Sequence, residues 1–185
     1  WYQLTLEPNT LFHAKPPKLP EHDTLWEMQQ QGQQLLAESG YQHYEVSAYA
    51  KPGKQCQHNL NYWLFGDYIG IGAGAHGKIT QLKQQKMIRR QNFKHPKDYM
   101  DTEKNYACSE TTISNPLFDY MLNALRLKQP IPIKHIAERT LLEQQSIMSA
   151  IEKPIKAGLL LQQNNHLTKT KKGNDFLNDL IEYFL

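Results

Sequence analysis

The apolar positions of residues 1–77 form short strand-like runs with one helical stripe between them. Residues 2–6, 44–49 and 68–72 have the short apolar pattern of strands, and the last run leads into a loop rich in glycine and alanine. Strands that alternate with helices are typical of a parallel sheet or of the end of a barrel. The first part of the chain is therefore predicted to be α/β.

The helix between the first two runs has both a start and a stop signal. Thr24 and Glu27 fit a capping box, and Gly40 is a plausible end. Four apolar residues fall on one predicted face of this helix: Leu25, Met28, Leu35 and Leu36.

Residues 78–115 are rich in glutamine, lysine and arginine. They predict a hairpin or an extended connector, followed by a short helix after Pro96. Their basic side chains can follow a phosphate backbone, but a solvated hairpin face is favoured because aromatic residues are sparse here. These side chains are Lys78, Lys83, Lys86, Arg89, Arg90, Lys94 and Lys97.

Residues 116–185 have the pattern of helices with one hairpin. Asn115 and Pro116 are typical of an N-cap and a first helical position, and two more helices are expected within 136–157, around a break at 138–140. The hairpin and the last helix are expected at 159–161, 166–168 and 176–184. This order predicts a mainly helical, winged-helix-like C-terminal domain, and domains of 1–77, 78–115 and 116–185.

A winged-helix order raises the possibility of DNA binding. The expected recognition region, residues 140–157, carries Lys153 and Lys156 against Glu143 and Glu152. Such a balance is poor for phosphate contacts, so nucleic acid is not the expected partner.

Composition indicates a folded, soluble protein. Of 185 residues, 39% are hydrophobic and 21% charged, with a net charge of +3, which permits nucleic-acid binding without requiring it. No apolar run approaches the ~20 residues of a membrane span, and no secretory signal opens the chain. The cytoplasm is the expected location.

The two cysteines, Cys56 and Cys108, are too few for a disulfide scaffold and make no CxxC pair. Cys56 is either a thiolate ligand or, more commonly, a small buried hydrophobic residue. The chain opens without Met inside a strand-like run, so we expect it to be a piece of a larger protein with a missing part upstream.

Two segments have candidate chemistry. Residues 69–77 follow a strand with small residues, which lets a ligand approach the backbone; the alternative is a tight turn packed under a helix. His58, two residues after Cys56 and close to aromatic residues, offers an imidazole beside flat apolar surface, as a haem requires; the alternative is a loop that plugs a barrel. Glu7 either contacts a cofactor or caps a turn.

Seven short motifs occur in a fixed order along the chain. They are EPNT at 7–10, PP at 16–17, YEVS at 44–47, YAKPG at 49–53, HNLNYW at 58–63, GIGAGAHG at 70–77 and MLNALRL at 121–127. Through this ordered set, which covers nearly the whole chain, the sequence resembles the oxygen-independent coproporphyrinogen III oxidase-like branch of the radical S-adenosylmethionine proteins. It is most similar to the HemW-type haem chaperones of that branch.

The resemblance implies the C-terminal part of an incomplete radical S-adenosylmethionine barrel, followed by a helical domain. It implies a [4Fe-4S] cluster on a CxxxCxxC motif that these residues do not contain, so this chain should not bind the cluster or be active alone. It also implies S-adenosylmethionine contacts at Ala50, Gly72, Gly74 and Ala75. Haem contacts are implied at His58, Asn59, Tyr62, Trp63 and His76, with His58 as the candidate iron ligand.

Three functions remain open from the sequence. The first, implied by HNxxYW, is haem binding and transfer to acceptor proteins. The second is oxidative decarboxylation of coproporphyrinogen III through a 5′-deoxyadenosyl radical. The third is nucleic-acid binding by the C-terminal domain.

Overall fold

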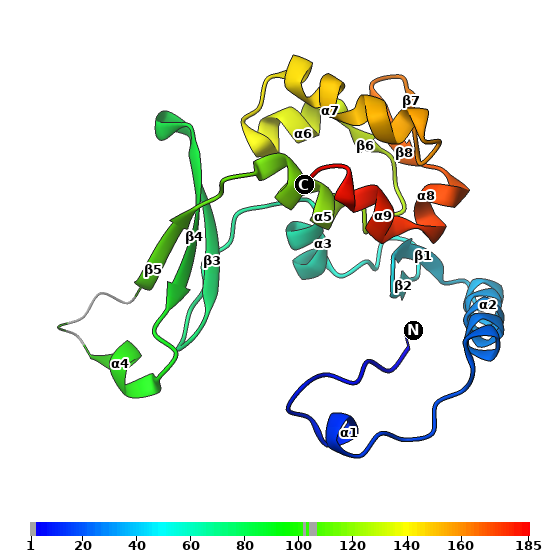
Figure 1. The fold of residues 1–185 in the computed structure, drawn as a ribbon. Helices are drawn as coiled ribbons and strands as arrows, with labels where there is room; N and C mark the ends of the chain where they lie inside the picture. The colour runs from blue at the N-terminus through cyan, green and yellow to red at the C-terminus, as the bar shows by residue number, and fades with distance from the viewer. Residues whose placement is uncertain (1–2, 102, 104–106) are drawn as a thin grey trace. The chain divides into compact units, whose positions relative to one another are not determined.

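The computed structural model describes residues 3–101, 103 and 107–185, with the side chains of 107 and 108 left out. The chain separates into two compact units, Trp1–Cys56 and Gln57–Leu185, and each is described by itself (Figure 1).

The first unit consists of two helices and a hairpin. Its elements are α1 (Leu11–Ala14), α2 (His22–Glu38), β1 (Gln42–Glu45) and β2 (Ala48–Ala50). The predicted helix is present, and Gly40 ends it at a φ of +81°, with its N–H donating to Ala37 O. The predicted capping box is wrong, because Glu21 is the N-cap and Thr24 lies inside the helix.

Two strand predictions for this unit were also wrong. The single strand at 44–49 is a hairpin, because the Glu45 carboxylate accepts the Ser47 N–H at 3.1 Å and closes a local turn. Residues 3–6 do not form a strand, because no strand among the described residues lies beside them to accept their hydrogen bonds.

The second unit begins with α3 (Gln57–Trp63) and a three-stranded antiparallel sheet. The sheet has the order β3–β4–β5, from β3 (His76–Gln81), β4 (Lys86–Asn92) and β5 (Ala107–Thr112). The short helices η1 (Leu82–Gln84) and α4 (Pro96–Met100) join these strands, which confirms the predicted hairpin and the helix after Pro96. The predicted strand at 68–72 is reduced to a single bridge between Tyr68 and Lys78.

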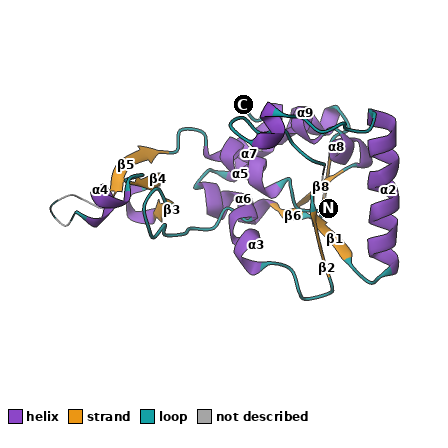
Figure 2. Ribbon diagram, turned by 90° about the horizontal axis from the view of Figure 1, so that it is seen from below, coloured by secondary structure: helices purple, strands orange, loops and turns teal. Residues whose placement is uncertain are grey.

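The remainder of this unit is mainly helical (Figure 2). Its elements are α5 (Pro116–Ala124), β6 (Ile131–Pro132), α6 (Ile133–Thr140), α7 (Gln144–Lys156), β7 (Leu160–Gln163), β8 (His166–Lys169), α8 (Lys171–Asp175) and α9 (Leu177–Glu182). Asn115 caps α5 through the Phe118 N–H, as predicted. The break lies at Leu141, just beyond 138–140, where a φ of +60° ends α6. All strand pairs in the described residues are antiparallel, so the expected parallel sheet is not seen there.

One hydrophobic core holds the sheet to these helices. Phe65 lies in the segment before the sheet, and Met87 lies in β4. Both are buried in one cluster with Tyr120 and Met121 of α5. Burial of such side chains contributes roughly 1.5–3 kcal/mol each. Residues 57–92 are therefore fixed to the C-terminal helices through this core.

No described helix is long and apolar enough to cross a membrane.

Candidate functional site

Helix α3 brings His58 and Tyr62 together. The two residues are four positions apart, so they lie on one helical face. Their rings meet edge to face, with centroids 4.8 Å apart and planes at 85°. His58 is exposed at the start of the helix, and Tyr62 is half-buried. An accessible imidazole is thus held beside an aromatic surface.

Tyr68 extends this aromatic surface. Its ring lies 4.6 Å from that of Tyr62, at 71°, and its backbone exchanges two hydrogen bonds of 3.0 and 2.9 Å with Lys78 of β3. We call His58, Tyr62 and Tyr68 the aromatic ladder. The role of Tyr68 was not predicted from the sequence, because its contact depends on the pairing of segments ten residues apart.

Trp63 is on another face of α3. The guanidinium of Arg126 lies 4.5 Å from its ring centroid, in a cation–π contact. Asn59 is half-buried. Of the four HNxxYW residues, the structure therefore groups His58 with Tyr62 and places Trp63 against Arg126, two residues after the end of α5.

A buried lysine fixes the chain that leaves α3. Lys78 is 2% exposed, and its ammonium donates to Phe65 O at 3.1 Å, to Asp67 Oδ1 at 2.8 Å and to Thr80 Oγ1 at 3.4 Å. It also lies 4.2 Å from the Phe65 ring centroid. Asp67 in turn accepts the Thr80 N–H and hydroxyl, each at 2.8 Å. The prediction that Lys78 lies on a solvated basic face is therefore wrong, because this side chain is buried.

The electrostatics of this pair follow from its burial. Burial lowers the pKa of Lys78 below its ordinary value, while Asp67 opposes that change. Burial acts to raise the pKa of Asp67, but hydrogen bonds from Lys78 and Thr80 outweigh it, so the pKa lies below its usual range. Asp67 is therefore charged at neutral pH, and its carboxylate favours the protonated form of Lys78.

The glycine-rich segment after Tyr68 is held by the sheet. The Asn92 side-chain amide donates to Gly70 O at 3.1 Å and to Gly72 O at 2.9 Å, and the Gly72 N–H donates to the Tyr99 hydroxyl at 3.1 Å. The Gly74 and Ala75 N–H groups donate to Phe93 O and Gly72 O. These amides are thus used within the chain, and any ligand contact here would rely on close backbone approach.

The remaining predicted residues lie elsewhere. His76 is exposed at the start of β3, and its carbonyl packs so closely on Gly70 that a Cβ there would lie 2.2 Å from it. Ala50 is buried at the end of β2 in the first unit. Cys56 is exposed, so the buried alternative is wrong; Cys108 lies among the side chains left out. Glu7 O accepts the Thr10 hydroxyl that caps α1.

Metal ligands do not cluster in the described part of the chain. No group of three or more His, Cys, Asp or Glu side chains is arranged to hold an ion there. A [4Fe-4S] cluster on CxxxCxxC needs three thiolates, and the sequence supplies two cysteines 52 positions apart. These residues therefore do not fit the cluster, although a single imidazole such as His58 can fit a haem iron.

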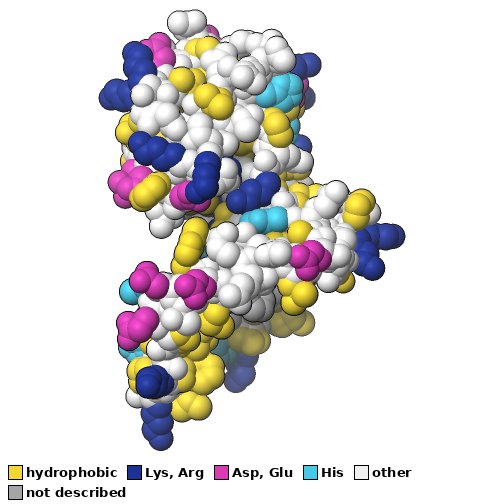
Figure 3. Space-filling model, turned by 90° about the vertical axis from the view of Figure 1, so that its right-hand side faces the viewer, with side chains coloured by type: hydrophobic (Ala, Val, Ile, Leu, Met, Phe, Trp, Pro, Cys, Tyr) yellow, Lys and Arg dark blue, Asp and Glu magenta, His cyan; other side chains and the backbone are white. Residues whose placement is uncertain are grey.

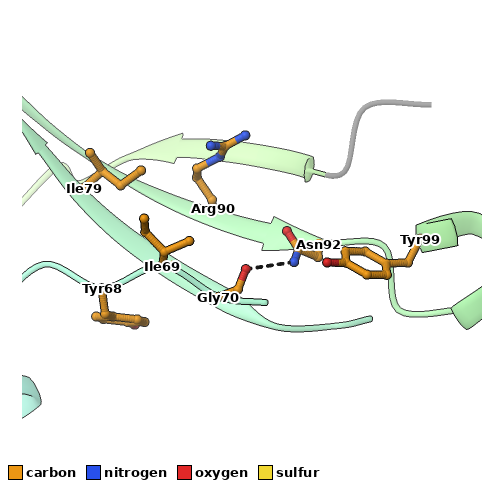
Figure 4. Close-up of a pocket in the computed structure, with 8 residues that line it drawn as sticks. Tyr68, Ile69, Gly70, Ile79, Arg90, Asn92 and Tyr99 are labelled. Atoms are coloured by element: carbon orange, nitrogen blue, oxygen red, sulfur yellow. Dashed lines mark hydrogen bonds between the residues drawn. The ribbon is translucent and has the colours of Figure 1, made fainter. Parts of the chain in front are cut away.

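A pocket opens on the sheet beside the ladder (Figure 4). Its volume is about 270 Å³, and Ile69, Ile79, Arg90 and Tyr99 are among the residues that line it, together with Tyr68. Among the described residues that line it, Arg90 is the charged one.

Comparisons with known proteins agree with the sequence motifs. The HemN C-terminal domain family matches residues 114–176. The whole chain is 44% identical to heme chaperone HemW of Escherichia coli (strain K12), covering 49% of that protein, and 44% identical to heme chaperone HemW of Haemophilus influenzae, covering 48%. It thus spans about half the length of the curated relatives it matches.

A solved structure has the same fold. Coproporphyrinogen III oxidase (HemN) from Escherichia coli, a radical SAM enzyme, matches with a TM-score of 0.63 and 17% identity, over 92% of this chain and 43% of that one. The α/β prediction is confirmed at this level. Residues 114–176 thus match the HemN C-terminal domain family, and the whole chain is similar in sequence to heme chaperones HemW and in fold to HemN.

Proposed function

We propose that the protein binds haem and transfers it to acceptor proteins, with His58 as an axial ligand of the iron. The observation that carries this proposal is the exposed His58 imidazole held edge-on to Tyr62 within an HNxxYW segment. Its relatives over the full chain are named heme chaperones, which supports the same function.

The chemistry of the ladder suits a porphyrin. A neutral imidazole is a common iron ligand, and the rings of Tyr62 and Tyr68 offer flat apolar surface next to it. Asn59, Trp63 and His76 are also proposed to contact the macrocycle. Trp63, stacked on Arg126, is proposed to fix α3 and thereby to support Tyr62.

The likeness to HemW and HemN supports two further cofactors for the complete protein. S-adenosylmethionine is proposed to contact Ala50, Gly72, Gly74 and Ala75 by close backbone approach, and a [4Fe-4S] cluster would need cysteines beyond these residues. Together these groups supply radical chemistry in such proteins. The division into 1–77, 78–115 and 116–185, the incomplete barrel and the cytoplasmic location also remain proposals.

The C-terminal elements are proposed to form a winged-helix-like domain that does not bind nucleic acid. Their order, α5–β6–α6–α7–β7–β8, supports the first part. For the second part, Lys156 of α7 is 3.3 Å from Glu152. On the face in Figure 3, basic side chains are also interspersed with acidic ones. Phosphate binding favours an uninterrupted basic surface.

The second candidate is coproporphyrinogen III oxidation, favoured by the likeness in fold to HemN. At 17% identity that likeness concerns the fold, so the haem function ranks first. Anaerobic turnover of coproporphyrinogen III by the full-length protein, with its cluster reconstituted, would reverse this order.

The test is a haemin titration of the full-length protein, followed in the Soret region. His58→Ala should weaken binding by about tenfold or more. His22→Ala is the matched control, since His22 is also exposed in the first turn of a helix, and it should bind as the wild type does. Equal affinity of the wild type and His58→Ala would remove His58 as a ligand.

A further inference from the structure

The register of the sheet gathers the pocket residues on one face. Gly77 pairs with Arg90, and Ile79 pairs with Ile88, so Gly77, Ile79 and Arg90 share a face. Gly77 carries no side chain, so the backbone of residues 68–70 packs close to it, and a Cβ there would lie 3.2 Å from Tyr68 O. Ile69 is 80% exposed, although it borders a pocket. Figure 4 shows the Ile69 and Arg90 side chains on the same side of the sheet.

Arg90 gives this apolar pocket a single positive charge. Its Nε lies 3.0 Å from Oε1 of Glu110, and both side chains are about half exposed. Guanidinium has five N–H donors in a planar fork, so a single contact at Nε does not use all of them. Asn92 and Tyr99, the other polar lining residues, already bond to the glycine-rich segment.

The pocket adjoins the aromatic ladder through Tyr68. This residue lines the pocket, and its ring packs on Tyr62, whose ring packs on His58. Its ring points away from Ile69, so residues 68–70 form an edge with the ladder on one side and the pocket on the other (Figure 4). A flat ligand that lies over this edge can reach both.

We propose that the pocket receives the carboxylate-bearing edge of the tetrapyrrole, with the Arg90 guanidinium bound to a propionate carboxylate. Ile69 and Ile79 contact the apolar part of that edge, while the arginine supplies the fork–fork geometry that a carboxylate prefers. This inference rests on the proposed function and adds a specificity-determining residue to it.

The test compares haemin with haemin dimethyl ester, in which both carboxylates are blocked. In titrations of the full-length protein, Arg90→Gln should weaken haemin binding by about tenfold or more and leave ester binding unchanged. Wild type should prefer haemin to the ester by a similar factor. Arg89→Gln is the matched control: this neighbour on β4 faces the other side of the sheet and pairs with Asp119 at 2.7 Å.

Three outcomes would overturn the inference. Haemin affinity that is the same in Arg90→Gln and wild type would remove the arginine contact. Equal losses for haemin and ester would point to altered folding and not to a carboxylate contact. In either case, binding that still requires His58 would leave the proposed function intact, whereas no haemin binding to wild type would overturn both.

Discussion

The ammonium of Lys78 and the carboxylate of Asp67 lie 2.8 Å apart, with the lysine buried and the aspartate side chain 41% exposed. This pair joins β3 to the segment that leaves α3. Because the same ammonium also bonds to Phe65 O, the end of the helix that carries His58 is fixed to the sheet.

Replacing Asp67 should lower the free energy of unfolding more than replacing Lys78. Asp67→Ala leaves a buried cation without its counter-ion and should lower the free energy of unfolding by about 3 kcal/mol. Lys78→Met removes the buried charge and leaves a carboxylate that water reaches, so about 1 kcal/mol is expected. Urea unfolding of both variants measures this. A larger loss for Lys78→Met than for Asp67→Ala would contradict the asymmetry.

His135 should make stability depend on pH near neutrality. It lies 2.7 Å from the Tyr120 hydroxyl, and burial, aided by Arg139, lowers its pKa below the ordinary 6.5. As pH falls through about 6.5, the unfolded chain therefore takes up the proton before the folded protein does, and stability is lost down to the lower folded pKa. Above pH 7 this contribution is fully present.

The pH dependence is measured by urea midpoints between pH 8 and pH 5. The wild type should lose stability toward pH 5, and His135→Gln should show a flatter profile over this range. His166→Gln serves as the control, since His166 is exposed on β8. Profiles of equal slope in wild type and His135→Gln would mean that another group is responsible.

Gly70 should tolerate no side chain. A Cβ would lie 2.2 Å from the His76 carbonyl oxygen, which belongs to the backbone and cannot turn away. Gly70→Ala should therefore separate residues 68–72 from β3 and lower the melting temperature by several degrees. Gly53→Ala, where a Cβ meets open space at a φ of +71°, should cost only about 1 kcal/mol. A Gly70→Ala protein as stable as Gly53→Ala would show that the backbone can yield here.

Local signals in the sequence were sufficient for some features. The Asn115 cap followed from two adjacent residues, and the turn at Asn164 and Asn165 uses left-handed conformations that asparagine tolerates. The pairing of His58 with Tyr62 follows from their spacing on a helix. Each of these depends on few residues close in the sequence.

Features that depend on distant pairing could not be predicted. Lys78 looks like any lysine of a basic stretch until Asp67 and Phe65 O are known to surround it. Strand pairing sets the position of Tyr68 beside Tyr62, and strand register sets that of Arg90 opposite Gly77. The hairpin at residues 42–50 was missed because the hydrogen bond from the Ser47 N–H to the Glu45 carboxylate overrides the strand pattern.

The axial ligand itself can be tested most directly by replacing it with a different one. In the full-length His58→Cys protein loaded with ferric haem, a thiolate should replace the imidazole and change the Soret band and the electron paramagnetic resonance spectrum to those of a cysteinate-ligated haem. That result would make His58 the residue that binds the iron. Spectra identical to those of the wild type would mean that the iron is bound elsewhere, and would contradict the account.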